Sequence, residues 1–278
     1  MTALVPAPEP LPRPTTDAHT HLSTTAEHLG LDASELIARA AAVNVTRLVD
    51  VGTDVEDSVE AIRHAEASDR VVAAVAIHPN DAARLGPRLP GELERLRALI
   101  GASDRVRGVG ETGLDYFRTR EPEGRALQKE SFAAHIAWAK EFGKALVIHD
   151  RDAHADVADV LDAEGWPERV QFHCFSGDAA FARRCLDGGA WLSFPGTVTF
   201  KANHDLREAL ALTPADRLLV ETDAPYLTPM PYRGKPNASY LVPVTLRYLA
   251  EQRDADVAGL CDALHANATA VFGDWGAA

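Results

Sequence analysis

The stretch Val71-Val72-Ala73-Ala74-Val75-Ala76-Ile77 is the clearest indication of the fold of this chain, because it is apolar at every position. A strand with one face in water alternates apolar and polar residues, whereas a strand covered on both faces is a near-continuous apolar run. Shorter runs of the same kind recur at Ala145 to Ile148 and at Leu218 to Val220. The pattern therefore predicts a parallel sheet covered by helices.

Eight segments of the chain, this run among them, have strand character. They are Thr15 to His19, Arg47 to Val51, Val71 to Ile77, Val106 to Glu111, Ala145 to His149, Val170 to Cys174, Trp191 to Phe194 and Leu218 to Glu221. Helical patterns lie between them, such as Ser34 to Val43, and Gly273 is the stop signal of the last helix. Eight units of about 35 residues predict an α/β fold of the (β/α)8 TIM barrel type.

A doubly wound open sheet is the alternative arrangement of the same elements. It would gather ligands only near a topological switch point, whereas a barrel brings the ends of all its strands to one opening. No repeat or interior linker marks a second domain. We expect a flexible Pro-rich leader at 1–14, a single barrel domain at 15–273 and a C-terminal tail at 274–278.

The formal net charge of −13 argues against broad, tight binding of nucleic acid through a basic face. Any contact with nucleic acid should therefore be local. No apolar stretch has the length of a signal peptide or a membrane helix, and the three cysteines have no pairing pattern. We expect a cytoplasmic protein without membrane association, and nothing indicates an obligate protein partner.

Ligand-type side chains follow several of the predicted strands. The six candidates for metal binding are His19, His21, Glu111, His149, His173 and Asp223. Imidazole and carboxylate groups bind divalent ions, and three protein ligands per ion leave positions for water and substrate. Six ligands are enough for two ions if Glu111 bridges them.

Each of these residues also has a purely structural explanation. A lone histidine at a strand end is often a hydrogen-bonded core residue, and Asp223 could cap a helix before Ala224-Pro225. Six such groups at the same end of buried strands would cost several kcal/mol each without a compensating cation. We therefore interpret the set as a metal centre. His78, which follows the run at Val71 to Ile77, could reach this centre or pack beneath it.

The motifs around these residues resemble those of the TatD family of metal-dependent deoxyribonucleases, within the metal-dependent hydrolase superfamily. They are DAHTHL, GETGLDY, IHDRDA, FHCFSG, SFPGTVTFK and LLVETDAPYLTPMPYRGKPN, and the resemblance runs from about Asp17 to Phe272. One departure is Asn80, where the family often carries a histidine. This departure bears on substrate contacts rather than on metal loading.

The resemblance implies a role for each candidate ligand. One ion would be held by His19, His21 and Asp223, the second by His149 and His173, with Glu111 bridging the two. Such a pair of cations activates a water and neutralises the charge that develops on an attacked phosphodiester. Asp223 could also take a proton from that water and pass it to the leaving oxygen, and Glu111 is the other residue we place in the catalytic set.

Further residues are candidates for substrate contacts. Arg151 could hold a phosphate in a fork, and Arg233 and Lys235 could meet the flanking backbone or be solvated loop charges. His78 could reach the substrate. Aromatic rings could stack a terminal base or simply pack the loops, namely Tyr226, Tyr232 and Phe117.

The resemblance implies an enzyme of the deoxyribonuclease class that acts on DNA strand ends, often from the 3′ end of single strands, with RNA as a further substrate. The alternative is a hydrolase of small esters, lactones or amides, although many such relatives use a carboxylated lysine where this chain has Glu111. A metal-binding protein without catalysis would be expected to lack Asp223. The two divalent ions could be Mg, Mn, Zn or Ni, because the mixed ligand set suits each of them.

Overall fold

The computed structural model describes residues 4–275 and contains one sheet of eight parallel strands. The strands are β1 (Thr15–Thr20), β2 (Val45–Val51), β3 (Val71–Val75), β4 (Val106–Asp115), β5 (Ala145–Arg151), β6 (Val170–Phe172), β7 (Trp191–Phe194) and β8 (Leu218–Val220), paired in that order. Just beyond β8, the Asp223 amide donates to the His19 carbonyl and the His21 amide to the Ala224 carbonyl, each at 3.0 Å. The sheet is a nearly closed barrel, which confirms the predicted single-domain TIM barrel over the open sheet.

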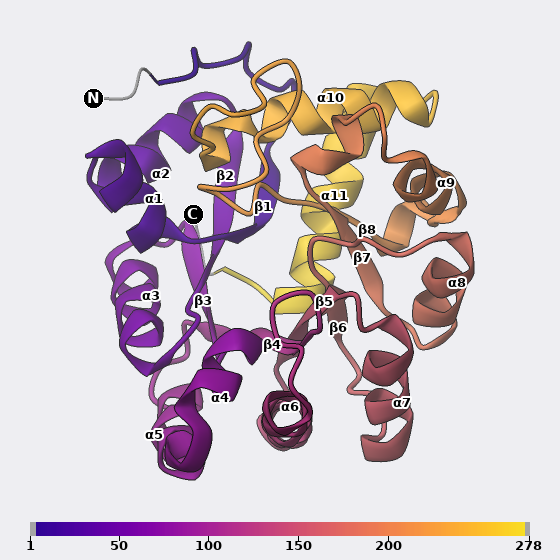
Figure 1. Cartoon of the computed structure of the whole chain (residues 1–278). Coiled ribbons are helices and arrows are strands. Elements are labelled where there is room, and N and C mark those ends of the chain that lie inside the picture. The colour runs from indigo at the N-terminus through magenta and orange to yellow at the C-terminus, as the bar shows by residue number, and fades with distance from the viewer. Residues whose placement is uncertain (1–3, 276–278) are drawn as a thin grey trace.

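Helices alternate with the strands and surround them (Figure 1). They are α1 (Leu22–Leu29), α2 (Ala33–Ala42), α3 (Val55–Ala67), α4 (Pro79–Leu85), α5 (Leu89–Ile100), α6 (Pro122–Glu141), α7 (His154–Glu164), α8 (Ala179–Asp187), α9 (His204–Leu212), α10 (Val242–Gln252) and α11 (Val257–Phe272). Within residues 4–275, none of the helices combines the length and the apolar character that crossing a bilayer requires.

The apolar run at β3 is buried on both faces, as predicted. Val71 and Val75 belong to the core between the strands and the outer helices, whereas Val72 and Ala74 belong to the cluster inside the barrel. Successive side chains of a strand point to opposite faces, so both sets must be apolar. Trp275, just after α11, is buried in the interior cluster. The barrel therefore has an apolar interior below its polar mouth.

The leader differs from the flexible segment that its composition predicts. Val5 and Leu11 are buried in the core, and the Tyr240 hydroxyl donates to the Val5 carbonyl at 2.8 Å. Burial of two aliphatic side chains favours attachment, and the prolines reduce the entropy lost on ordering. Residues 4–14 thus pack on the barrel, while 1–3 and 276–278 of the predicted leader and tail lie outside the described residues.

Candidate metal centre

The alternation of side chains along the strands places several ligands at the mouth of the barrel. Val147 lies in the interior cluster, and His149 follows two residues later on β5. Leu219 of β8 lies in the same cluster and is followed by Glu221. Because residues two apart point to the same face, the interior rows of these strands end in polar groups at their carboxyl ends.

A bulge in β4 places Glu111. Val109 pairs with Leu146 and Thr112 pairs with Ile148, so two residues of β4 face one residue of β5. A Cβ on Gly110 would lie 2.4 Å from the Cβ of Val147, so a side chain cannot be accommodated there. The strand continues past the predicted end at Glu111 to Asp115. The bulge lies between Val109 and Thr112, so it contains Glu111.

One carboxylate oxygen of Glu111 faces His19 of β1 and His21, which lies between β1 and α1. His19 Nε2 lies 3.5 Å from Glu111 Oε2 and 3.8 Å from Asp223 Oδ1. His21 Nε2 lies 3.4 Å from Asp223 Oδ1 and 3.8 Å from Glu111 Oε2. These four side chains therefore converge on one point.

The other oxygen of Glu111 faces a second set of imidazoles. Glu111 Oε1 lies 2.5 Å from His149 Nδ1, 2.8 Å from His173 Nε2 and 3.5 Å from His78 Nε2. Donor atoms of His78, Glu111 and His149 are close enough together to hold one ion, as are those of His19, His21 and Glu111. His78 thus reaches the centre rather than packing beneath it.

The donor atoms fit divalent cations. His19 is fully buried, and neither of its ring nitrogens has a hydrogen-bond partner among residues 4–275. An unpaired buried polar group is costly, and a cation would satisfy it. Donors about 2.1 Å from a tetrahedral ion lie about 3.4 Å from one another, which is close to the spacing around His19 and His21. All six predicted ligands lie in this cluster.

Buried carboxylates lie behind two of the predicted ligands, and sequence reasoning missed these. His173 Nδ1 lies 3.2 Å from Glu221 Oε1, and His149 Nε2 lies 3.3 Å from Asp115 Oδ2. Glu221 also accepts from the Ser193 hydroxyl at 2.5 Å. Such outer carboxylates fix the orientation of ligand imidazoles. The motifs contain these residues, but only the fold places them behind the ligands.

The electrostatics follow from burial and from the crowding of carboxylates and imidazoles. Burial lowers the pKa of His19, and the nearby His173 adds to that effect. Burial also opposes protonation of His21 and His149, but the adjacent carboxylates outweigh it and raise each pKa to about 9. Burial would raise the pKa of Glu111, yet the surrounding imidazoles hold it well below its usual range. Cation binding at these imidazoles would therefore release protons.

A cavity of about 760 Å³ opens over these ligands, and three predicted substrate residues line it: His78, Arg151 and Tyr226. The Arg151 guanidinium lies 3.9 Å from the centroid of the Phe117 ring, and Phe117 and Tyr226 are exposed. Arg118 and Arg84 also line the cavity, although no sequence signal singled them out.

The remaining predicted contacts lie elsewhere. Arg233 and Lys235 line a neighbouring hollow instead of the cavity, with Arg233 stacked over the Phe200 ring at 4.5 Å. Tyr232 packs against the core, so the packing interpretation holds for that ring.

Comparison with known proteins shows which family this chain resembles. Residues 16–273 match the family model described as TatD related DNase. The chain is 50% identical over 238 residues to the "Uncharacterized metal-dependent hydrolase TatD" of Mycobacterium tuberculosis, covering 84% of this chain and 89% of the relative. It is 34% identical over 259 residues to the "3'-5' ssDNA/RNA exonuclease TatD" of Cronobacter sakazakii, covering 90% and 95% of the two chains.

A solved structure agrees with the sequence comparisons. The crystal structure of YJJV, a TatD homolog from Escherichia coli K12, superposes with a TM-score of 0.83 at 25% identity, covering 93% of this chain and 97% of that one. The barrel, the motifs and the cluster of histidines and carboxylates all agree with these matches. The chain is a metal-dependent hydrolase and belongs to the TatD family.

Proposed function

We propose that this hydrolase cleaves phosphodiester bonds and is a 3′-5′ exonuclease acting on single-stranded DNA, with RNA as a further substrate. It would use two divalent ions. His19, His21 and Asp223 would hold one ion and His149 and His173 the other, with Glu111 between them. One observation supports this proposal most directly. The two carboxylate oxygens of Glu111 face two separate sets of imidazoles.

The bound cations would activate a water for attack and offset charge on the phosphate. Asp223 is suited to proton transfer, because it reaches the cavity and faces His21 through Oδ1, which leaves its second oxygen for the attacking water. Glu111 would have both oxygens engaged. It would therefore position the centre and would not move a proton.

Other side chains of the cavity suit a strand end. The guanidinium of Arg151 can hold a phosphate in a fork, and its stacking on Phe117 keeps the group over the cavity. The exposed ring of Tyr226 lies near His21, with ring centroids 6.4 Å apart, and offers a surface on which a base can stack. His78 would contact either the substrate or the second ion.

The choice of nucleic acid is supported by the relative from Cronobacter sakazakii, whose name specifies a 3′-5′ exonuclease of single-stranded DNA and RNA. A net charge of −13 disfavours a long basic track, so recognition of a strand end at the cavity is the form of binding that the charge allows. Ester, lactone or amide hydrolysis is the alternative, because the same activated water would attack a carbonyl carbon.

A direct assay separates these possibilities. Metal-stripped protein is incubated with end-labelled single-stranded DNA, duplex DNA, RNA and a panel of lactones and esters, with Mg²⁺, Mn²⁺ or Zn²⁺ restored separately. We expect metal-dependent shortening of single strands from the 3′ end. Hydrolysis of the small esters without digestion of DNA would instead support the alternative.

Two variants guard against contaminating nuclease. His149→Ala removes a ligand, whereas His64→Gln changes a histidine on α3 that does not line the cavity. We expect His149→Ala to lose the activity and His64→Gln to retain it. Equal digestion by the wild type and His149→Ala would refute the exonuclease proposal.

A further inference from the structure

A second hollow of about 420 Å³ lies beside the metal-centred cavity. We call it the basic hollow, and the lining residues that matter here are His28, Phe200, Pro225, Leu227, Arg233 and Lys235. Leu227 lines both the hollow and the cavity, so the two spaces are neighbours. The hollow therefore begins where a strand leaving the cavity past Tyr226 could continue.

The charge of the hollow is unusual for so acidic a chain. Its lining includes Arg233, Lys235 and His28, and none of its lining residues within 4–275 is a carboxylate. The side chains of Arg233 and Lys235 are exposed and have no ion-pair partner in that part of the chain. Two unneutralised cations in a small concave space favour an anion.

The apolar part of the lining adds a second feature. The Phe200 ring stacks under the Arg233 guanidinium at 4.5 Å, and Pro225 and Leu227 supply further apolar surface. A ring that holds a guanidinium in place limits its motion, so less entropy is lost when it binds a phosphate. Apolar surface beside a phosphate-binding group suits a nucleotide better than a free inorganic anion.

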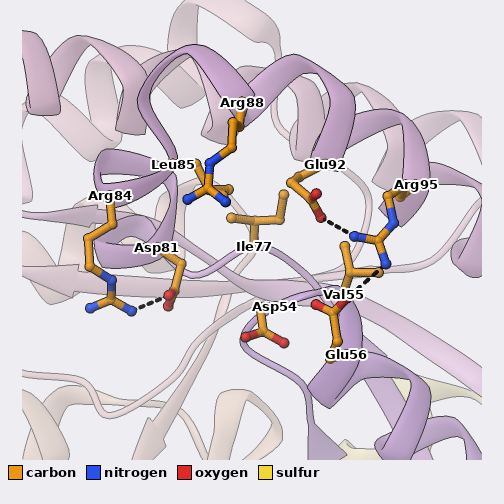
Figure 2. Close-up of a pocket in the computed structure, with 10 residues that line it drawn as sticks. All are labelled: Asp54, Val55, Glu56, Ile77, Asp81, Arg84, Leu85, Arg88, Glu92 and Arg95. Carbon is orange, nitrogen blue, oxygen red and sulfur yellow. Dashed lines mark hydrogen bonds and ion pairs between the residues drawn. The ribbon is translucent and has the colours of Figure 1, made fainter.

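A groove lined by residues of α3, α4 and α5 shows that arginines alone do not make such a site. In the groove of Figure 2, Arg84 pairs with Asp81, and Arg95 lies 2.7 Å from both Glu56 and Glu92. That groove is lined by four carboxylates and three guanidiniums, so negative charges outnumber positive charges there. The basic hollow differs because no carboxylate of residues 4–275 lines it.

We propose that the basic hollow binds a backbone phosphate of the substrate strand, one or more nucleotides away from the bond that is cut. This inference rests on the proposed nuclease function and adds to it a preference for oligonucleotides over substrates with a single phosphate. Arg233 and Lys235 bind the remote phosphate, and the hollow sets the minimum length of an efficient substrate.

The test compares substrates that do and do not reach the hollow. Metal-loaded wild type, Arg233→Gln and Lys235→Gln are assayed on bis(4-nitrophenyl) phosphate and on single-stranded oligonucleotides of increasing length. Arg88→Gln is the matched control, because Arg88 is an exposed arginine that lines the groove of Figure 2 and neither the cavity nor the basic hollow. Binding of a labelled oligonucleotide to the same substitutions in an Asp223→Asn background is measured by fluorescence anisotropy.

We expect the hollow variants to raise KM for the longer oligonucleotides about tenfold, the effect of one lost charged hydrogen bond, with little change in kcat. Hydrolysis of bis(4-nitrophenyl) phosphate should be unchanged, and the dependence of binding on salt should weaken by about 0.7 in log–log slope per lost contact. Arg88→Gln should match the wild type on every substrate.

Three results would overturn the inference. One is an unchanged KM for long oligonucleotides in both hollow variants, and another is an equal loss on the long and the single-phosphate substrates. The third is an equal dissociation constant for the labelled oligonucleotide with and without Arg233→Gln. If the wild type cuts no DNA, the nuclease proposal fails by itself, and this binding measurement still tests whether the hollow binds a phosphate.

Discussion

Replacement of Gly113 by alanine tests how the fold positions His149, which we propose as a metal ligand. Gly113 has a φ of +139°, and a Cβ there would lie 2.1 Å from the carbonyl oxygen of His149. Since Cβ contacts shorter than 3.0 Å essentially never occur, β5 would have to move by about 1 Å at the residue that carries the ligand. We expect overpacking to lower the free energy of unfolding by about 3 kcal/mol. For a chain of this length the melting temperature should fall by about 5 °C.

The loss of activity should exceed what the loss of stability explains. Displacement of a ligand by about 1 Å can cost about 100-fold in rate, so we expect that drop in kcat at a temperature where the variant is fully folded. Circular dichroism gives the melting temperature, and initial rates on a phosphodiester give kcat. Gly143→Ala is the control, because its φ of +59° is also positive but no atom of the described residues 4–275 lies within 4 Å of a Cβ there. Wild-type kcat in Gly113→Ala would refute the reasoning.

Three other predictions concern the support of the centre and the stability of the barrel. Glu221→Gln weakens the partner of His173 Nδ1, so metal affinity in a chelator competition should fall 10- to 100-fold; unchanged affinity would contradict the orienting role. Removal of divalent ions with EDTA should lower the melting temperature by about 5 °C, the effect of an ion present at about 100 times its Kd, and re-addition should restore it. The hydrogen bond to Asp50 raises the pKa of His64 above 6.5. Wild type should therefore have a free energy of unfolding in urea about 1 kcal/mol higher than that of His64→Gln. This advantage should be full below pH 6.5 and should decline as the pH rises through the raised pKa. An advantage that does not change between pH 6 and pH 9 would argue against this ion pair.

The fold was predictable because the strands are buried on both faces. An apolar run such as Val71 to Ile77 has few structural alternatives, and the eight-fold alternation with helices selected the barrel. The ends of strands were less certain. β4 runs to Asp115 because its pairing with β5 resumes at Thr112 after the bulge. Apart from Gly110, the sequence contains little that would indicate such a bulge.

The candidate site was predictable to the extent that each ligand follows a strand. His149 and His173 could be placed at one mouth because parallel strands of a barrel end on the same side. Glu221 was missed because a carboxylate before the Asp223 motif has no distinguishing neighbours in sequence. Arg233 and Lys235 were placed with the substrate, but whether they line the cavity or a separate hollow depends on how the loop after β8 folds.

The proposed function requires Glu111 to lie between two divalent cations. Crystals grown with Mn²⁺ and measured at the manganese absorption edge test it most directly, together with metal content by mass spectrometry in solution. We expect two anomalous peaks, one beside each carboxylate oxygen of Glu111, about two ions per chain, and loss of that pair in Glu111→Ala. A single peak, peaks away from these histidines, or two ions retained in Glu111→Ala would contradict the account.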